Sequence, residues 1–428
     1  MIIKNNKKTN FNITLSFLLF FIFINYVYFY LNLTTTLNNE AYSFNELFIN
    51  YQAGFIRRGL LGEISWILKH QLSIEPKIFF SIFFFIIYLL KVFLFFYLSK
   101  KFIISKYILI LIIFSPALLL FHIYSPELYF LRDGLIKFSL LLHAVIFYKF
   151  FYFKKNKDLY FKLLNVIIIP LVFILILIHE YQVFSISLHI LLTLGAIKTK
   201  YEFKKLIICF APLILSVILV AIFFGNETQF NLLSELLLKY NIKLNPYLGG
   251  GLYSYLGGFY KWHFFYFSYR DFINLFFSFI LSFVIFYILF DYLIKKKILL
   301  FHSKYQKSYL YYFVPVLIPF FLTSDHGRNL SFLSFYFVIF CLSLKLNDLS
   351  LIKKINSLKK NNLNQIFLIL FLFFYVFLWK LNQMAGFGLR GIPNDIFQSS
   401  LFAEFIKFIK YLYIYIDLNF YDLPEIKL

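Results

Sequence analysis

The stretch 78–98 reads IFFSIFFFIIYLLKVFLFFYL and contains one charged side chain, that of Lys91. An α-helix needs about 20 mostly apolar residues to cross the hydrocarbon core of a bilayer, so this stretch is predicted to be a transmembrane helix. The rest of the chain has the same character. Of 428 residues, 61% are hydrophobic and 14% are charged, and the mean hydropathy is +0.78. This composition excludes a set of soluble domains and predicts an all-α, polytopic integral membrane protein.

Ten more apolar runs are long enough to be spans where neighbouring helices shield their ends. They are 13–33, 107–124, 134–152, 163–178, 181–197, 206–224, 272–293, 309–323, 329–345 and 363–380. We therefore predict about eleven transmembrane helices in a single transmembrane domain that covers residues 1–428. Almost nothing separates 163–178 from 181–197, so this pair could instead be one bent or re-entrant unit.

The basic residues orient these spans. The formal net charge is +22, yet the lysines fall in short runs between apolar stretches, which is how membrane topology is encoded. Lys4, Lys7 and Lys8 place the N-terminus in the cytoplasm. With eleven spans, the other lysine clusters fall on the same side: 100–106, 154–157, 198–205, 295–297 and 353–360. The sequence predicts a bacterial inner-membrane protein with its C-terminus outside, in contact with membrane lipid and not with nucleic acid.

Three predicted outer segments are long enough to fold, namely 34–77, 225–271 and 381–428. In the first, Ser43 and Glu46 have the spacing of a capping box, and this predicts short interfacial helices. The second is rich in glycine and aromatic residues, and the third is amphipathic over 401–416. Both are predicted to lie along the outer membrane surface.

Arginine is rare in this chain, and its positions are informative. The arginines are Arg57, Arg58, Arg132, Arg270, Arg328 and Arg390. All of them fall on the predicted outer side, which the positive-inside rule disfavours. A guanidinium grips phosphate or carboxylate through two parallel N–H groups and stays charged when desolvated. An anionic ligand at the outer face is the favoured interpretation, and the alternative is that these arginines pair with Asp or Glu to hold loops together.

Four short outer junctions carry arginine or acid/base groups. They are GFIRRGLLGE at 54–63, Glu127 with RDG at 132–134, HE at 179–180 and DHGR at 325–328. The plain structural alternatives are, in order, a turn docked on lipid headgroups, a helix cap, a boundary Glu bonded to water and a self-satisfied turn. Brought to one membrane face, the junctions would form an acid/base and anion-binding site. The candidate catalytic residues are Glu46, Asp133, His179, Glu180 and Asp325, and the candidate phosphate-binding residues are Arg57, Arg58, Arg132 and Arg328.

The sequence assigns no cofactor. Cys209 and Cys341 lie in separate apolar stretches and build neither a disulfide framework nor a zinc site. No helical His pair with Glu and no Asp-x-Asp occurs, although a divalent metal is possible. Nucleotide-binding phosphate loops are missing and the cytoplasmic loops are short, so a sugar donor is expected to be lipid-linked and outside.

At these junctions the chain resembles a group of bacterial polytopic membrane proteins with an RRGL-type first loop and a D-x-G-R turn. Its layout is similar to that of the GT-C glycosyltransferases and the polyprenyl-linked glycan polymerases and ligases. The resemblance implies a lipid-phosphate sugar as ligand and these roles: Glu40 or Glu46 as first-loop acid, Glu127 or Asp133 as second-loop acid, and Arg57, Arg58 and Arg328 as phosphate grips. GT-C enzymes commonly have an Asp in the first loop, whereas no Asp precedes Asp133 here.

The expected function is that of a membrane glycosyltransferase or glycan polymerase acting on a polyprenyl-phosphate-linked or other anionic glycan at the outer face. Two alternatives stay open: a transporter or flippase for an anionic solute or lipid-linked glycan, and a non-catalytic subunit of an envelope complex. A transporter should show internal repeats and mid-span charges, and the sequence contains no convincing repeat. Glu180 is expected to face water, either ionised beside Arg132 or Arg328 or unpaired with a raised pKa.

Overall fold

The computed structural model describes residues 18–26, 42–102, 112–122, 132–153, 155–223, 225–239, 242–244, 276–283, 299–300, 309–322, 326–343, 345–346, 370 and 375. Over these residues the fold is all-α, as the composition predicts. Within the same ranges, one short antiparallel pairing joins β1 (Leu299–Leu300) to β2 (Lys345–Leu346).

Four helices among the described residues are long and apolar enough to cross a membrane. They span Pro76–Ser99, Asp133–Phe151, Lys157–Ile178 and Lys200–Ile222, and coincide with the spans predicted at 78–98, 134–152, 163–178 and 206–224. Shorter apolar helices occupy Gln182–Leu194, Tyr309–Phe320 and Gly327–Ser343, where 181–197, 309–323 and 329–345 are predicted. The other predicted spans are described only in part, so the total of eleven stays a prediction.

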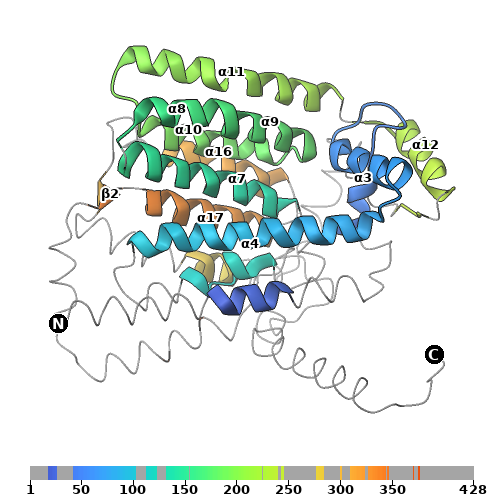
Figure 1. Cartoon of the computed structure of the whole chain (residues 1–428), viewed down its shortest axis with the longest axis horizontal. Helices are drawn as coiled ribbons and strands as arrows, with labels where there is room; N and C mark the ends of the chain where they lie inside the picture. Colours follow the sequence, from blue (N-terminus) through green and yellow to red (C-terminus); the bar gives the residue numbers. More distant parts are fainter. Residues whose placement is uncertain are drawn as a thin grey trace.

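The helical elements follow one another along the chain as α2 (Tyr42–Asn45), the 3-10 helix η1 (Glu46–Phe48), α3 (Gly59–Gln71), α4 (Pro76–Phe102), the 3-10 helix η2 (Leu119–His122), α7 (Asp133–Ile146), the π-helix η3 (Phe147–Phe153), α8 (Lys157–Leu163), the π-helix η4 (Leu164–Ile168), α9 (Ile169–Ile178), α10 (Gln182–Leu194), α11 (Lys200–Ile222), α12 (Glu227–Leu238), α16 (Tyr309–Leu322) and α17 (His326–Ser343). The long helices pack with similar axes, and α3 and α12 lie at one end of the bundle (Figure 1).

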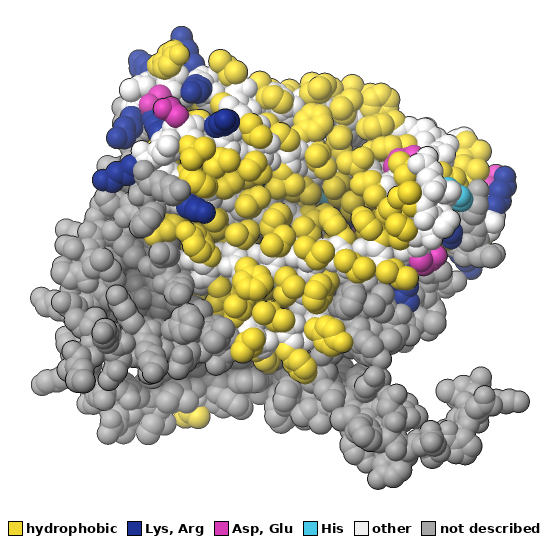
Figure 2. Space-filling view, viewed as in Figure 1, with side chains coloured by type: hydrophobic (Ala, Val, Ile, Leu, Met, Phe, Trp, Pro, Cys, Tyr) yellow, Lys and Arg dark blue, Asp and Glu magenta, His cyan; other side chains and the backbone are white. Residues whose placement is uncertain are grey.

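The outward faces of the long helices are apolar. On α4, Ile78, Ile82 and Ile86 are exposed, while Phe80 and Phe84 on the opposite face are buried. A helix that is apolar on both its packed and its outward face is typical of a membrane span. Figure 2 shows the resulting hydrophobic belt, with Lys and Arg on either side of it, many of them at the upper left. The exposed basic side chains of the loop and first turns of α11 are Lys198, Lys200, Lys204 and Lys205.

The pair predicted at 163–178 and 181–197 forms two antiparallel helices. The first runs without a break through α8, η4 and α9 to Ile178, and the second, α10, begins after the turn 179–181. The hydroxyl of Tyr160 in α8 lies 3.3 Å from that of Thr193 at the end of α10, so the two helices run in opposite directions. The wide turn of η4 ends at Ile168, two residues before Pro170, which has no N–H to donate to the preceding turn.

The stretch 107–124 differs from the single span predicted there. Its described part is helical at 112–113 and again in η2, with turns between them. Pro116 accounts for the break, because a proline restricts the residue before it and lacks the N–H that a helix interior needs. The Ser115 hydroxyl accepts from the Ala117 N–H at 3.2 Å and closes the turn that replaces the helix.

The described part of the first predicted outer segment, residues 42–77, contains short helices, but the predicted capping box is wrong. Ser43 lies inside α2 rather than before a helix, and Glu46 begins η1 with a buried side chain. The Glu46 carboxylate accepts from Arg58 instead. The helix α3 approaches this segment closely at Gly62, where an added Cβ would lie 1.8 Å from the Ile49 carbonyl oxygen.

The second outer segment begins with α12. Asn226 caps this helix by accepting from the Gln229 N–H at 2.9 Å, and Phe230, Leu233 and Leu237 pack with the first outer segment. The residues from 245 to 271 and the tail 381–428 lie outside the described residues, so their surface positions stay predictions.

Candidate functional site

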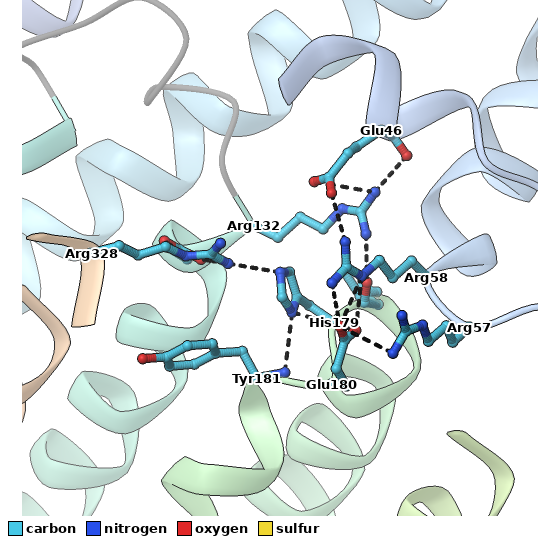
Figure 3. A network of polar contacts seen from close by, with 10 residues as sticks. Glu46, Arg57, Arg58, Arg132, His179, Glu180, Tyr181 and Arg328 are labelled. Carbon is cyan, nitrogen blue, oxygen red and sulfur yellow. Dashed lines mark hydrogen bonds and ion pairs between the residues drawn. The ribbon is translucent and has the colours of Figure 1, made fainter. Parts of the chain in front are cut away.

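Four chain junctions meet at the end of the bundle that carries α3 (Figure 3). They are the turn before α3, the first residues of α7, the turn 179–181 and the first turn of α17. Each junction is a helix end, where a charged side chain can be placed without interrupting an apolar helix. The lysine pattern predicts that this end of the bundle is the outer one.

The Arg58 guanidinium joins two carboxylates. Its Nε donates to both oxygens of Glu180, at 3.0 and 2.9 Å, and its Nη2 also donates to Glu180 Oε1. Its Nη1 donates to Glu46 Oε1 at 2.8 Å. A lysine has a single nitrogen and cannot reproduce this planar bridge, so the contact uses the property that distinguishes arginine from lysine.

The backbone of Arg58 is also unusual. The residue precedes α3 with φ 65° and ψ 1°, a left-handed conformation that residues other than glycine seldom adopt. Such a conformation costs about 1–2 kcal/mol and persists where surrounding contacts outweigh it. Here the ion pairs with Glu46 and Glu180 offset the cost. Backbone strain held by charge pairs is concentrated at binding and catalytic sites, which marks Arg58 as a candidate functional residue.

Arg57 and Arg132 also contact the segment that joins α9 to α10. Arg57 Nη1 lies 3.7 Å from Glu180 Oε1. Arg132 Nη1 donates to the carbonyl oxygen of Ile178, the last residue of α9, at 3.0 Å, and its Nη2 donates to the Glu46 carbonyl oxygen. Because the last carbonyls of a helix have no partner within it, Arg132 satisfies one of them and fixes where α9 ends.

Arg328 brings the fourth junction into the cluster. Its Nη2 donates to Asp133 Oδ1 at 2.8 Å, and its Nε lies 2.6 Å from Asp133 Oδ2. Asp133 is the first residue of α7 and is fully buried, so its carboxylate serves this two-point pair rather than a surface cap. Asp325 lies outside the described residues, and the self-satisfied turn considered from the sequence is therefore not tested there.

His179 lies between the Arg58 and Arg328 ion pairs. The Tyr181 backbone N–H donates to His179 Nδ1 at 3.1 Å, and Arg328 Nη2 lies 2.8 Å from His179 Nε2. A neutral imidazole has one acceptor nitrogen and one N–H. Because a guanidinium only donates, the neutral ring accepts either from Arg328 at Nε2 or from the Tyr181 N–H at Nδ1, and not from both at once.

Burial and charge set the protonation of this turn. Burial by itself would raise the pKa of the Glu180 carboxyl, but the adjoining cations, Arg58 foremost, hold it well below 4.5. Burial lowers the pKa of the His179 imidazole well below 6.5, although the Glu180 charge opposes this. At neutral pH the turn therefore carries an ionised carboxylate beside a neutral imidazole.

The structure brings together every candidate site residue except Asp325, which is not described. Glu180 is ionised, one of the two outcomes expected from the sequence, but its partners are Arg58 and Arg57 rather than Arg132 or Arg328. The pairing of arginines with acids across loops, the alternative to an anion site, is also present. The catalytic and phosphate-binding roles of these residues stay predictions.

Metal binding has no counterpart in the described ranges, where no group of three or more His, Cys, Asp or Glu side chains is placed to hold an ion. Cys209 and Cys341 are buried and are not joined in a disulfide. The divalent metal considered from the sequence stays an untested possibility.

Sequence reasoning passed over several polar groups inside the helices. Lys137 of α7 is buried, donates to the Ser331 hydroxyl at 2.5 Å and lies over aromatic rings. Lys91 of α4 is equally buried, and His143 and His189 lie within α7 and α10. The signal was available, because an ionisable residue inside an apolar run is costly in a membrane and marks a candidate functional position.

The cluster has an accessible layer and a supporting layer. The side chains of Arg58, Arg328 and Glu180 are 12%, 12% and 13% exposed, whereas those of Arg132 and Asp133 are 1% and 0% exposed. A ligand arriving from the end of the bundle would therefore meet two guanidiniums and one carboxylate, and Arg132 and Asp133 would position them. Among known proteins, no protein-family model, no curated protein and no solved structure matches the chain.

Proposed function

We propose that this chain is a membrane glycosyltransferase or glycan polymerase that acts on a polyprenyl-phosphate-linked glycan at the outer face of the bacterial inner membrane. The observation that carries the proposal is the convergence of Arg57, Arg58, Arg132 and Arg328 on residues 178–180, at one end of the apolar helices (Figure 3). A lipid-linked sugar phosphate has the same two parts, because its apolar tail lies in the hydrocarbon core and its phosphate lies at the membrane surface.

The accessible layer supports phosphate binding. Arg58 and Arg328 would hold phosphate oxygens. Guanidiniums that are fixed before the reaction stabilise the negative charge that develops on a leaving phosphate without reorganising. A phosphate that displaces part of the contact between Arg58 and Glu180 replaces one anion with another, so the guanidinium stays paired throughout.

Proton transfer in this proposal falls to Glu180. It is the most exposed acid of the cluster, at 13% against 6% for Glu46 and 0% for Asp133, so an accepting sugar hydroxyl can reach it. Its low pKa makes it a weak base. We therefore expect it to take the proton late, as the hydroxyl oxygen bonds to the sugar carbon and becomes acidic.

The test compares two lipids that differ only in phosphate. The purified protein is titrated in detergent with polyprenyl diphosphate and with the free polyprenol of the same length, and binding is followed by native mass spectrometry. Wild type should prefer the diphosphate, and Arg58→Lys and Arg328→Lys should lose most of that preference, because lysine keeps the charge and loses the fork. Lys157→Gln, which breaks an ion pair with Glu202 at the other end of the bundle, is the matched control and should keep it. Equal binding of both lipids by wild type would refute the proposal.

A transporter or flippase of the same ligand is the second candidate, and the buried Lys91 and Lys137 favour it. Charged side chains within apolar helices are typical of transport pathways. The two functions leave different products. An enzyme releases the polyprenyl phosphate or diphosphate and lengthens or transfers the glycan, whereas a transporter returns the lipid-linked glycan chemically unchanged on the other side.

A further inference from the structure

A second polar cluster lies inside the bundle, between α7, α8 and α10. It consists of the fully buried side chains of Ser139, His143, Tyr160, Gln182, His189 and Thr193. Polar groups among apolar helices are costly unless they bond to one another, and in membrane proteins they mark pathways for ions and protons. The proposed glycosyl transfer uses none of them.

These side chains form a continuous line of hydrogen bonds. His143 Nδ1 lies 3.0 Å from His189 Nδ1, and His143 Nε2 lies 2.9 Å from the Tyr160 hydroxyl. The Tyr160 hydroxyl donates to Thr193 at 3.3 Å, and Thr193 donates to the His189 carbonyl oxygen at 3.0 Å. At the other end, Gln182 Nε2 lies 3.5 Å from His189 Nε2.

One set of proton positions satisfies the whole line. Gln182 donates to His189 Nε2, the His189 Nδ1–H donates to His143 Nδ1, and the His143 Nε2–H donates to the Tyr160 oxygen. The Tyr160 O–H then donates to Thr193. Each imidazole uses one N–H and one acceptor nitrogen, as a neutral ring requires.

The reverse set satisfies it as well. In the first set, the buried Gln182 Oε1 accepts no hydrogen bond. Rotating the amide by half a turn presents Oε1 to His189 Nε2. The Tyr160 O–H then donates to His143 Nε2, the His143 Nδ1–H to His189 Nδ1, and the His189 Nε2–H to Gln182. The same heavy atoms thus support two opposite polarities, which is the property a proton relay needs.

The line extends toward both ends of the bundle. Gln182 is the first residue of α10, and its backbone N–H donates to the His179 carbonyl oxygen at 3.1 Å. His179 belongs to the charged cluster at the predicted outer end of the bundle, here named the outer cluster, which consists of Glu46, Arg57, Arg58, Arg132, Asp133, His179, Glu180 and Arg328. Tyr160 lies in the first turn of α8, whose first residue, Lys157, is 29% exposed. From Gln182 to Thr193 the helix rises about 16 Å at about 1.5 Å per residue, roughly half of a hydrocarbon core of about 30 Å.

We propose that this line is a proton-transfer path between the outer cluster and the lysine-rich end of the bundle. A proton binds His189 Nε2, the Nδ1 proton of His189 passes to His143 Nδ1, and the Nε2 proton of His143 passes to the Tyr160 oxygen. The original Tyr160 hydroxyl proton passes to water at the lysine-rich end of the bundle, beyond Thr193. One proton enters and one leaves, and no other bond changes. Rotation of Gln182 and the Tyr160 hydroxyl then completes the reverse set, and the line returns to the first set when each imidazole moves its remaining proton back to its other ring nitrogen. The path does not depend on which substrate the outer cluster binds.

Proton flux through the purified protein in liposomes tests the proposal. Vesicles with an entrapped pH-sensitive dye receive a potassium diffusion potential through valinomycin, and the rate of internal pH change is recorded. Wild type should exceed protein-free vesicles. His143→Gln, His189→Gln and Tyr160→Phe should fall to the protein-free rate, because each removes a group that both accepts and donates a proton. Tyr160→Phe keeps the ring that packs against Phe147 and Phe161.

Ser187→Ala is the matched control on α10. The Ser187 hydroxyl donates to the carbonyl oxygens of Phe184 and Tyr312 and lies outside the line, so this variant should conduct like wild type. The unfolding temperature of each variant shows whether it folds. A wild-type flux equal to that of empty vesicles would overturn the proposal, as would a folded Tyr160→Phe that conducts at the wild-type rate. Loss of flux in Ser187→Ala would also overturn it.

Discussion

Glu180 is the residue on which the outer cluster depends, because Arg57 and Arg58 both pair with it. Glu180→Gln keeps the shape of the side chain and removes its charge. Removing one partner of a buried ion pair costs about 3–5 kcal/mol, and we expect about 2–3 kcal/mol here because the pair is partly open to solvent. The measurement is the unfolding temperature of the purified protein in detergent.

The control for this residue lies at the opposite end of the bundle. Lys157 pairs with Glu202, but the two side chains are 29% and 25% exposed. Lys157→Gln should therefore cost less than about 1 kcal/mol. If both variants lowered the unfolding temperature equally, the Glu180 pairs would stabilise the fold no more than an exposed surface ion pair does. That result would contradict the prediction.

His179 is expected to make the stability of the folded protein depend on pH. Its folded-state pKa lies well below 6.5 because of burial, so the unfolded chain binds a proton below pH 6.5 that the folded chain does not. Stability contributed by the neutral ring is present above 6.5 and is lost as the pH falls. Glu180, whose folded-state pKa lies below 4.5, loses its contribution only below that value. The unfolding temperature of wild type, relative to His179→Gln, should therefore fall between about pH 7.5 and about pH 5; parallel curves would contradict this.

At the scale of elements, the placement of α3 depends on one close approach. An added Cβ at Gly62 would lie 1.8 Å from the Ile49 carbonyl oxygen, whereas one at Gly134 in α7 would meet nothing within 4 Å. Gly62→Ala must push α3 away from η1 and so separate Arg58 from Glu46. We expect a loss of about 2–4 kcal/mol for Gly62→Ala, as for other overpacked sites. Gly134→Ala should be neutral or stabilise by up to about 1 kcal/mol. Unfolding temperatures of the two variants decide, and equal values would show that the approach at Gly62 is unimportant.

The sequence predicts the long elements better than the irregular ones. The helices α4 and α11 follow from apolar length alone, because a bilayer leaves few other structures for such a run. In contrast, Pro116 breaks the stretch 107–124 although its composition resembles that of a span. The capping box at Ser43 fails because Glu46 finds stronger partners in Arg58 and Arg132, and no local pattern contains that information.

In the molecule as a whole, the sequence predicts that the candidate site residues lie together, but it does not predict which of them form ion pairs. The outward bias of arginine indicates that the junctions share one face, and the structure places them together. The choice of partners depends on packing, since Arg58 and Glu180 are separated by 122 positions and Arg328 and Asp133 by 195. The line through His143 and His189 was missed because each histidine was read as part of an apolar run.

The bundle has the arginine cluster at one end and a lysine-rich loop at the other, and this predicts which residues face each side of the membrane. The helix α11 has 23 residues, or about 34 Å at about 1.5 Å per residue, enough to cross a hydrocarbon core of about 30 Å. Lys200 lies at its lysine-rich end, and Thr228 lies in α12, just beyond its other end; both are exposed. The native Cys209 and Cys341 are buried and leave little background for labelling. In intact spheroplasts, a membrane-impermeant maleimide should therefore react with Thr228→Cys, and with Lys200→Cys only after permeabilisation. The opposite pattern would invert the orientation and place the arginine cluster in the cytoplasm, and labelling of both variants without permeabilisation would show that α11 does not cross the membrane.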